Sequence, residues 1–236
     1  MEKQERIDGK MQKQTTFSKV QRKPYLVYLK QVKEGGGREI LYAPQKNGGK
    51  LLVNPNGFPW VNISLNPMSS MVRKGQHHTI EDSGFDLVIS ILEFLFEKYG
   101  EDTKSMVYME NVQFDGINCK KITFTNPNFK YINYKIKAGE TLKSIAQKYM
   151  ISEYMILEKN KSISSYEDIK VGDEISIPND YSPNMELIID IERKIPLSAK
   201  IFDDKGLYEY YKYFKVVVNP VFTPLDFDAN NSEYGF

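Results

Sequence analysis

Hydrophobic and polar positions alternate along most of this chain, and a period of two residues is typical of half-buried strands. Dipeptides that favour tight turns separate the alternating runs, as Asp8-Gly9 and Asn47-Gly48 do, and the glycines at 35–37 add another turn. The pattern predicts strands at residues 11–22, 25–30, 39–42, 51–53, 107–112, 120–125, 186–192, 199–202, 207–211 and 216–218. We therefore expect a chain built mainly from antiparallel hairpins.

One long segment has the period of a helix. Its apolar residues recur at spacings of three and four, namely Phe85, Val88, Leu92, Leu95 and Tyr99. Gly100 is placed to end the helix as the residue after its C-cap. Apolar residues cover most of the helix circumference, so we expect the helix to be packed on two sides.

Residues 134–178 combine both periods in a short space. Tyr134 and Ile136 alternate with lysines, as in a strand, and Thr141 is a good N-cap for the helical stripe that follows. A second short helix, capped by Ser152, leads through a polar loop to a last strand. The order is strand, helix, helix, strand. It suits a unit that buries two helices on a two-stranded sheet.

This segment resembles a LysM domain, a module that holds N-acetylglucosamine glycans such as peptidoglycan. The resemblance is carried by the turn from Gly139 to Leu142, the asparagine after the second helix, and the closing run that ends at Pro178. Met150 and the long loop 161–168 depart from the family pattern. The resemblance implies two glycan-binding segments, formed by Gly139, Glu140, Thr141 and Leu142 and, opposite them, by Asn160, Lys161, Ser162 and Ile163. The alternative is that Thr141 is only a helix cap and that Leu142 and Ile163 are only core residues.

Strand patterns on both sides of this unit indicate that it is inserted into a β-rich host. We expect a discontinuous host, residues 1–131 and 181–236, around a LysM domain at 132–180. The host resembles bacterial envelope proteins near the LolA/LppX lipoprotein-carrier superfamily, through short matches such as Gln76–Ile80, Asp190–Glu192 and Asp204–Gly206. That resemblance implies an α+β fold, a curved antiparallel half-barrel with a packed helix, whose relatives hold acyl chains in the concavity.

Composition limits the partners. Thirty-two basic and 31 acidic side chains give a net charge of +1, so no field draws the chain to nucleic acid or to an anionic membrane. Its one cysteine, Cys119, excludes an intrachain disulfide, and no zinc-type ligand spacing is present. The sequence therefore predicts no cofactor and no metal site. The first twenty residues have no apolar run of the kind a signal peptide needs. A glycan-binding module argues for export, so we expect a periplasmic or cell-envelope protein whose export signal this sequence does not include.

Three groups of residues could carry chemistry. His77 and His78 could ligate a metal, but neighbouring residues of a strand point to opposite faces, so a structural role is expected. Cys119 lies in a predicted strand, which favours a half-buried structural thiol over a nucleophile. Trp60 could stack on a sugar, but a loop plug packed on the core is the expected role.

The leading hypothesis is a non-enzymatic envelope protein that binds peptidoglycan-type glycan through its LysM insert. The alternative is a lipid or lipoprotein carrier that uses the concave face of the host. A peptidoglycan hydrolase that pairs Cys119 with His77 or His78 ranks third, because LysM units often accompany such enzymes.

Overall fold

The computed structural model describes residues 1–32 and 36–236. Eleven strands form one antiparallel sheet in the order β6-β5-β4-β3-β2-β1-β13-β12-β11-β8-β7, and β9 pairs with β10 in a second sheet. The strands are β1 (Glu2–Ile7), β2 (Lys10–Arg22), β3 (Tyr25–Gln31), β4 (Glu39–Tyr42), β5 (Leu51–Asn54), β6 (Ile63–Leu65), β7 (Val107–Phe114), β8 (Ile117–Thr125), β9 (Tyr131–Lys135), β10 (Glu174–Pro178), β11 (Asn184–Asp190), β12 (Pro196–Asp203) and β13 (Gly206–Lys212). The α-helices are α1 (Ser70–Arg73), α2 (Asp86–Tyr99), α3 (Thr103–Met106), α4 (Leu142–Tyr149) and α5 (Glu153–Lys159), and short 3-10 turns span Ile80–Asp82, Gly100–Asp102 and Pro224–Phe227. The predicted α+β class, with a helix packed on an antiparallel sheet, is confirmed, and the sheet is large and open.

Local turn chemistry sets the hairpins. Asp8 and Gly9, between β1 and β2, both have positive φ, of 49° and 76°. Asp115 and Gly116 repeat this conformation between β7 and β8, at 49° and 78°. Two central residues with positive φ give a turn whose twist matches that of the flanking strands, and Asp-Gly is a preferred pair for it. The predicted turn at Asp8-Gly9 is confirmed, whereas Gly35 of the predicted glycine turn lies outside the described residues.

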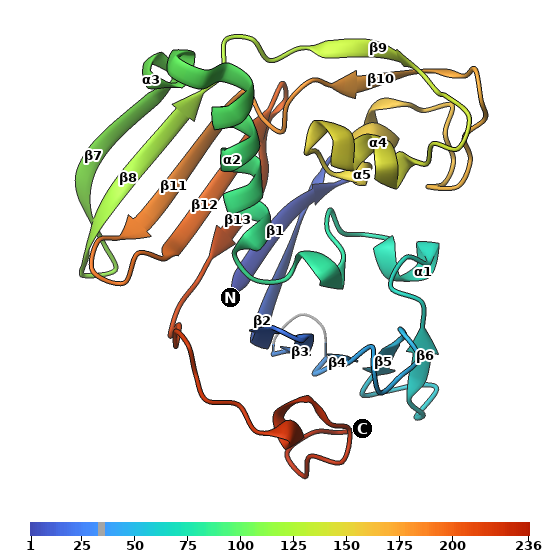
Figure 1. Cartoon of the computed structure of the whole chain (residues 1–236). Helices are drawn as coiled ribbons and strands as arrows, with labels where there is room; N and C mark the ends of the chain where they lie inside the picture. Colours follow the sequence, from blue (N-terminus) through green and yellow to red (C-terminus); the bar gives the residue numbers. More distant parts are fainter. Residues whose placement is uncertain (33–35) are drawn as a thin grey trace.

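The long strand β2 joins the two parts of the large sheet. Its first residues pair with β1, with Lys10 opposite Ile7, and its last residues pair with β3, with Arg22 opposite Tyr25. The sheet bends along β2, so that β3 to β6 turn away from the plane of β7, β8 and β11 to β13 (Figure 1). This bend gives the sheet a concave side.

Helix α2 crosses that concave side in front of β11 to β13 (Figure 1). Ile91 and Leu95 are buried against the sheet. Ile89 and Phe96, on the opposite side of the helix, are 47% and 50% exposed. The expectation that α2 packs on two sides is therefore wrong, because no element covers its outer apolar face among the described residues. Its predicted end is confirmed, since Gly100 is the C-cap and has a φ of 52°.

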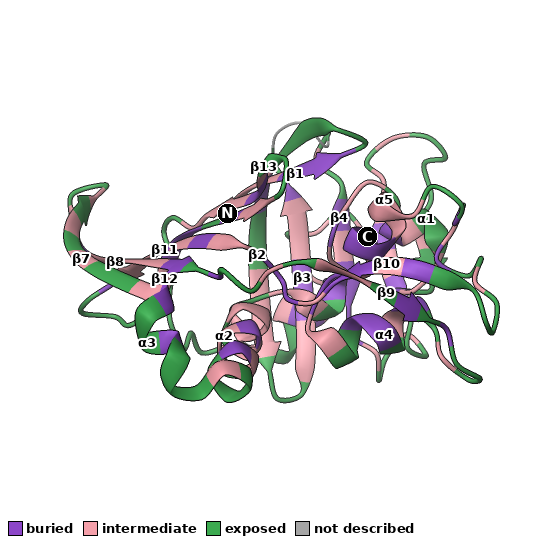
Figure 2. Ribbon diagram, turned by 90° about the horizontal axis from the view of Figure 1, so that it is seen from above, coloured by how far each residue is buried: buried purple, intermediate pink, exposed green. Residues whose placement is uncertain are grey.

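The unit formed by β9, α4, α5 and β10 lies over the middle of the large sheet. One hydrophobic cluster includes Ile145 and Ile156 of this unit together with Phe124, Leu187 and Ile201 of the large sheet. Buried residues gather where the unit meets the central strands, whereas the β7–β8 end of the sheet is mostly exposed or half-buried (Figure 2). The unit and the sheet therefore share one core.

The chain after β13 forms no further strand. The predicted strand at 216–218 is wrong, because this segment leaves the sheet and Val216 packs against the cluster that contains Cys119 and Leu197. The chain then returns to the far end of the sheet, where Phe227 is buried with Tyr28 and Leu41. The sequence patterns did not indicate β6, the short edge strand that pairs with β5.

Candidate functional site

The first segment of the predicted glycan site is the turn between β9 and α4. Gly139 has a φ of 80°, in the left-handed region that favours glycine. The carboxylate of Glu140 accepts hydrogen bonds from the Tyr134 hydroxyl at 2.5 Å and from the Lys137 amide at 2.9 Å. The bond to Tyr134 lowers the pKa of Glu140, and the same bond raises the pKa of Tyr134 to about 12. The turn is therefore held in one conformation with its carboxylate ionised.

The next two residues begin α4. The Thr141 hydroxyl accepts the Ser144 amide at 3.1 Å, and the Ser144 hydroxyl accepts the Thr141 amide at 2.9 Å, which completes a reciprocal cap. Thr141 is exposed, but the side chain of Leu142 is completely buried. The predicted N-cap is confirmed. Leu142 can reach a ligand only through its main chain, whereas the exposed edge of Thr141 remains accessible.

The second segment follows α5. The Asn160 side chain donates to the carbonyls of Ile156 and Ser176 at 2.7 and 2.8 Å and accepts the Ser176 amide at 2.8 Å. It thereby ties the end of α5 to β10. Lys161 and Ser162 are exposed, and Ile163 is buried in the cluster that also contains Leu142. The two segments thus pack on a shared core, with polar atoms at its surface.

Both departures from the LysM pattern have a structural solution. Met150 is the C-cap of α4 in the left-handed conformation, with a φ of 50°, which the family pattern more often assigns to glycine. In the long loop, Asp168 accepts the amide and the hydroxyl of Ser164 at 3.1 and 2.7 Å. These bonds close the loop beside the second segment, so its extra length does not leave the segment unsupported.

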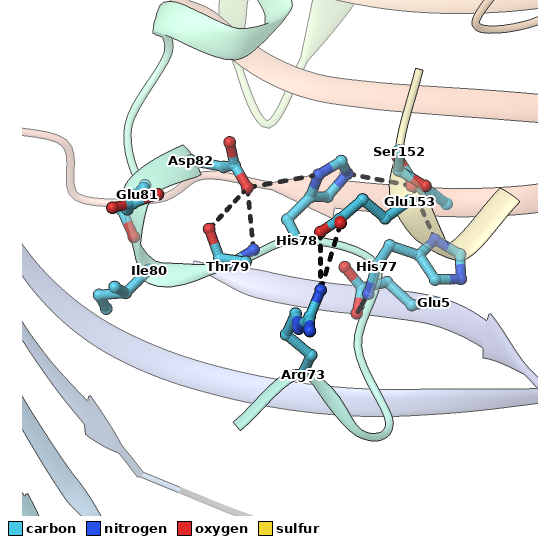
Figure 3. Close-up of polar contacts among 12 residues, drawn as sticks. Glu5, Arg73, His77, His78, Thr79, Ile80, Glu81, Asp82, Ser152 and Glu153 are labelled. Carbon is cyan, nitrogen blue, oxygen red and sulfur yellow. Dashed lines mark hydrogen bonds and ion pairs between the residues drawn. The ribbon is translucent and has the colours of Figure 1, made fainter. Parts of the chain in front are cut away.

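Ion pairs fix the unit to the host segment 66–82. Arg73 is buried and pairs with Glu153 of α5 at 3.1 Å (Figure 3). It also pairs with Glu167. Lys143 of α4 pairs with Glu81 at 3.0 Å. Burial raises the pKa of Glu153 although Arg73 opposes that shift. The host segment therefore holds both helices of the unit, α4 through Lys143 and α5 through Glu153.

A buried polar cluster lies where the unit, the host segment and the sheet meet. His77 and His78 both contact one carboxylate oxygen of Glu209 on β13, at 2.7 and 3.1 Å, and Glu5 accepts the Tyr211 hydroxyl at 2.8 Å. The members of this cluster are Glu5, His77, His78, Tyr181, Glu209 and Tyr211. Figure 3 shows the two histidines between the strand that carries Glu5 and the start of α5 at Ser152.

Charges within the cluster offset the cost of burial. Burial alone would lower the pKa of His78, but Glu209 outweighs it and raises that pKa to about 9. Burial opposes the charge of Glu209, yet the two histidines hold its pKa well below its usual range. The cluster therefore contains a charged pair near neutral pH. The sequence analysis did not identify Glu5 or Glu209 as site residues. The only indication in the sequence is that each is an acidic residue at an inward position of a strand, which is a weak signal.

The two histidines do not point to opposite faces, as the sequence suggested. Their segment is not a strand, and both rings reach the same Glu209 oxygen. In the part of the chain that the structure describes, no three His, Cys, Asp or Glu residues are placed to hold a metal ion. Cys119 is fully buried in β8, and burial raises the pKa of its thiol. The ring nitrogens of both histidines contact Glu209, and those of His77 and His78 also contact the Arg6 carbonyl and the Tyr181 hydroxyl, respectively. Neither histidine is therefore placed to activate the Cys119 thiol.

Trp60 does not plug the core. Its side chain is 79% exposed, so the expectation of a packed aromatic loop is wrong. No helix among the described residues is long and apolar enough to cross a membrane.

A family model described as "Protein of unknown function (DUF1571)" matches residues 1–153. The chain belongs to this family. A LysM domain model matches residues 134–178, so the DUF1571 match runs past β9 and through α4. The LysM resemblance is confirmed, and this DUF1571 chain contains a LysM domain. No curated protein has a matching sequence, and neither family description names a catalytic activity.

Two solved structures match most of the chain, with low TM-scores. One is a DUF1329 family protein from Desulfovibrio piger, at 9% identity and a TM-score of 0.26, covering 87% of this chain and 65% of that one. The other is a putative outer membrane lipoprotein-sorting protein domain from Vibrio parahaemolyticus, at 11% identity and 0.23, covering 87% and 64%. This chain thus spans slightly under two thirds of each.

Proposed function

We propose that this chain is a non-enzymatic cell-envelope protein that binds peptidoglycan-type N-acetylglucosamine glycan through its LysM domain. The observation that carries the proposal is the LysM match at 134–178 together with two ordered segments over one core. The domain spans 132–180 within a host of 1–131 and 181–236. Periplasmic or envelope placement follows from the ligand, because peptidoglycan lies outside the cytoplasmic membrane.

The geometry identifies which atoms would face the glycan. Leu142, Asn160 and Ile163 have buried or fully used side chains, so they support the two segments and offer main-chain groups. Gly139, Thr141, Lys161 and Ser162 are exposed and provide a hydroxyl, an ammonium group and amides. Such groups pair with sugar hydroxyls and N-acetyl groups. Glu140 holds the first turn by internal bonds.

The lipid or lipoprotein carrier remains a weaker alternative. Helix α2 and the LysM domain occupy the concave side of the sheet, where Ile91 and Leu95 are buried. The cavity between the LysM domain and the β12–β13 hairpin, lined by Met155, Tyr181 and Tyr208 among others, has a volume of about 20 Å³. That is space for about one water molecule and not for an acyl chain.

The proposal is tested by calorimetric titration of the intact chain with chitin oligomers. Ser162→Tyr places a bulky ring in the second segment at an exposed position, and we expect binding at least about tenfold weaker, because a ring there occupies space that the sugar needs. Gln147→Tyr is the matched control, since Gln147 is exposed on α4 outside both segments. Absence of heat with the intact chain at millimolar sugar, or equal effects of both variants, would reject the assignment.

A further inference from the structure

The hairpin loop between β5 and β6 presents an apolar tip to solvent. Phe58 is 87% exposed, Trp60 79% and Val61 61%, and Pro59 between them is also exposed. Monomeric proteins expose single apolar residues as a rule, but a run of four at a loop tip indicates a contact surface. Neither the LysM domain nor the proposed glycan site accounts for this run.

The backbone of the tip is strained at Trp60, and this strain keeps the indole ring in solvent. Trp60 has a φ of 62°, and its amide donates to the Gly57 carbonyl at 2.7 Å. A bulky side chain in the left-handed region is a genuine outlier, and such strain persists where it serves a site. Here it closes a tight turn and leaves the indole in solvent. The fold therefore holds this ring outward instead of burying it.

The surroundings of the tip offer few partners to a sugar. Stacked sugars need hydrogen-bond partners beside the ring. Asn54 donates to the Gly235 carbonyl at 2.8 Å and accepts the Asn56 amide at 2.9 Å. Asn56 donates to the Gly36 carbonyl at 2.7 Å, so both of these amide side chains are already used. Asn62, next to Val61, is exposed. The tip thus offers hydrocarbon, one indole N–H and one exposed amide side chain, a small polar set for a ligand with several hydroxyl groups.

The size of the tip argues against a folded protein as its occupant. Aromatic side chains bury about 150–250 Å² each, so the tip offers roughly 600 Å² at most. A stable protein interface needs about 800 Å² from each partner. A bilayer has no such threshold, because a small tip can enter the boundary between headgroups and acyl chains, where tryptophan is enriched.

The stretch that carries the tip holds no charged side chain. Residues 51–72 contain no Asp, Glu, Lys or Arg, so insertion would desolvate no charged side chain of this stretch. Exposed charges of both signs lie at the base of the tip: Arg38, whose neighbour Gly37 lies against Asn56, and Glu233, two residues before Gly235, which bonds to Asn54. The carboxylate of Glu39 is buried and paired with Lys30 at 2.9 Å. The tip therefore suits the headgroup region through its lack of charge.

We propose that the tip formed by Phe58, Pro59, Trp60 and Val61 inserts into the headgroup region of a lipid bilayer and holds the protein peripherally on the membrane. This function is independent of glycan binding. The tip lies on the β5–β6 hairpin, whereas the LysM domain contacts the chain further on, through Arg73 and Glu81. The two surfaces would let one chain join a membrane to a glycan.

Trp60 is the chain's one tryptophan, so its fluorescence reports on the tip alone. The experiment titrates the full chain with vesicles of phosphatidylethanolamine and phosphatidylglycerol and with vesicles of phosphatidylcholine. We expect a blue shift of the emission and reduced quenching by acrylamide with vesicles of either composition. The double variant Phe58→Ser, Val61→Ser keeps the reporter, and we expect it to partition about tenfold more weakly, because two apolar side chains no longer enter the bilayer. Tyr108→Ser, at an exposed apolar position on the far edge strand β7, is the control.

Four outcomes would overturn the proposal. Unchanged emission at millimolar lipid rejects membrane insertion. Equal loss in the Phe58, Val61 variant and the Tyr108 control shows that the effect is not specific to the tip. A shift on adding chitin oligomers instead of vesicles assigns the tip to glycan. A shift that depends on protein concentration without lipid assigns it to self-association. Vesicle binding by Ser162→Tyr must equal that of the parent chain, so failure of the glycan proposal would leave this result unaffected.

Discussion

At the scale of single residues, one carboxylate organises the junction between sheet and LysM domain. Glu209 is 1% exposed and receives hydrogen bonds from His77, His78 and Tyr181. Removing one partner of a buried charged pair is strongly destabilising, because the other charge stays without compensation. No local pattern in the sequence could identify this cluster, since Glu209 and the histidines are far apart along the chain and meet only in the folded sheet.

Glu209→Gln tests the importance of that charge. We expect a loss of about 3–5 kcal/mol in the free energy of unfolding, because His78 would keep its burial and lose its counterion. Urea denaturation monitored by circular dichroism measures the change. Glu233→Gln is the matched control at an exposed position, and a Glu209 variant as stable as that control would contradict the role given to the cluster.

The same pair predicts a dependence of stability on pH. The pKa of His78 is raised from 6.5 to about 9, so its stabilising effect is complete below about pH 6.5 and is lost as pH rises toward 9. The loss between pH 6.5 and 9 should be on the order of 3 kcal/mol. The depressed pKa of Glu209 adds stability above pH 4.5 that is lost in acid. Unfolding curves at pH 3, 5, 7 and 9 sample both arms, and His78→Gln should flatten the alkaline one; an unchanged slope in that variant assigns the loss to other groups.

Trp60 allows a test of backbone strain. Glycine tolerates the positive φ of this position, and the exposed indole contributes little packing. We therefore expect Trp60→Gly to raise the free energy of unfolding by about 1 kcal/mol or leave it unchanged. Thermal melts compare it with Phe58→Gly, which lacks the positive φ. A large loss of stability in Trp60→Gly alone would show that the indole packs on the fold.

At the scale of elements, the sequence predicted what depends on neighbouring residues. Asp8-Gly9, the Thr141 cap and the Ser152 cap were identified because each structure is set by residues at most three apart. The exposed face of α2 could not be predicted in this way. The sequence shows that Ile89 and Phe96 are apolar, but it does not show whether another element covers them. The same limit applies to 216–218, where three valines favour a strand that finds no place in the sheet.

Asn160 tests how the second glycan segment is held. Its side chain makes three hydrogen bonds that join α5 to β10. Asn160→Ala should lower the free energy of unfolding by about 1–3 kcal/mol and weaken glycan binding, because the segment loses its anchor. Asn133→Ala is the control, since Asn133 is exposed on β9 and bonds only to Glu174 at 3.3 Å. Equal stability of the two variants would show that the loop does not depend on this anchor.

At the scale of the whole molecule, the LysM domain is part of the fold and not a loosely attached module. Its core is continuous with that of the sheet, and Arg73 joins it to the host through two carboxylates. The sequence predicts the insertion, because strand patterns occur on both sides of the LysM segment. The docking of the LysM domain on the host could not be predicted, because Arg73, Glu153 and Glu167 cannot be told from ordinary surface charges in the sequence.

Arg73→Met tests the docking. The variant leaves Glu153 partly buried without a cation, so we expect faster amide hydrogen exchange in α5 and in residues 66–82, while β11 and β12 exchange as before. Lys74→Met is the matched control, since Lys74 is exposed. Uniformly faster exchange through the whole sheet would show that Arg73 stabilises the fold globally instead of the junction.

The central claim is that the LysM domain binds peptidoglycan, and co-sedimentation with insoluble peptidoglycan tests it most directly. The intact chain and Gln147→Tyr should pellet with the polymer, whereas Ser162→Tyr should stay largely in the supernatant with an unchanged circular dichroism spectrum. An intact chain that remains soluble, or a Ser162→Tyr variant that pellets as fully as the parent, would contradict the account.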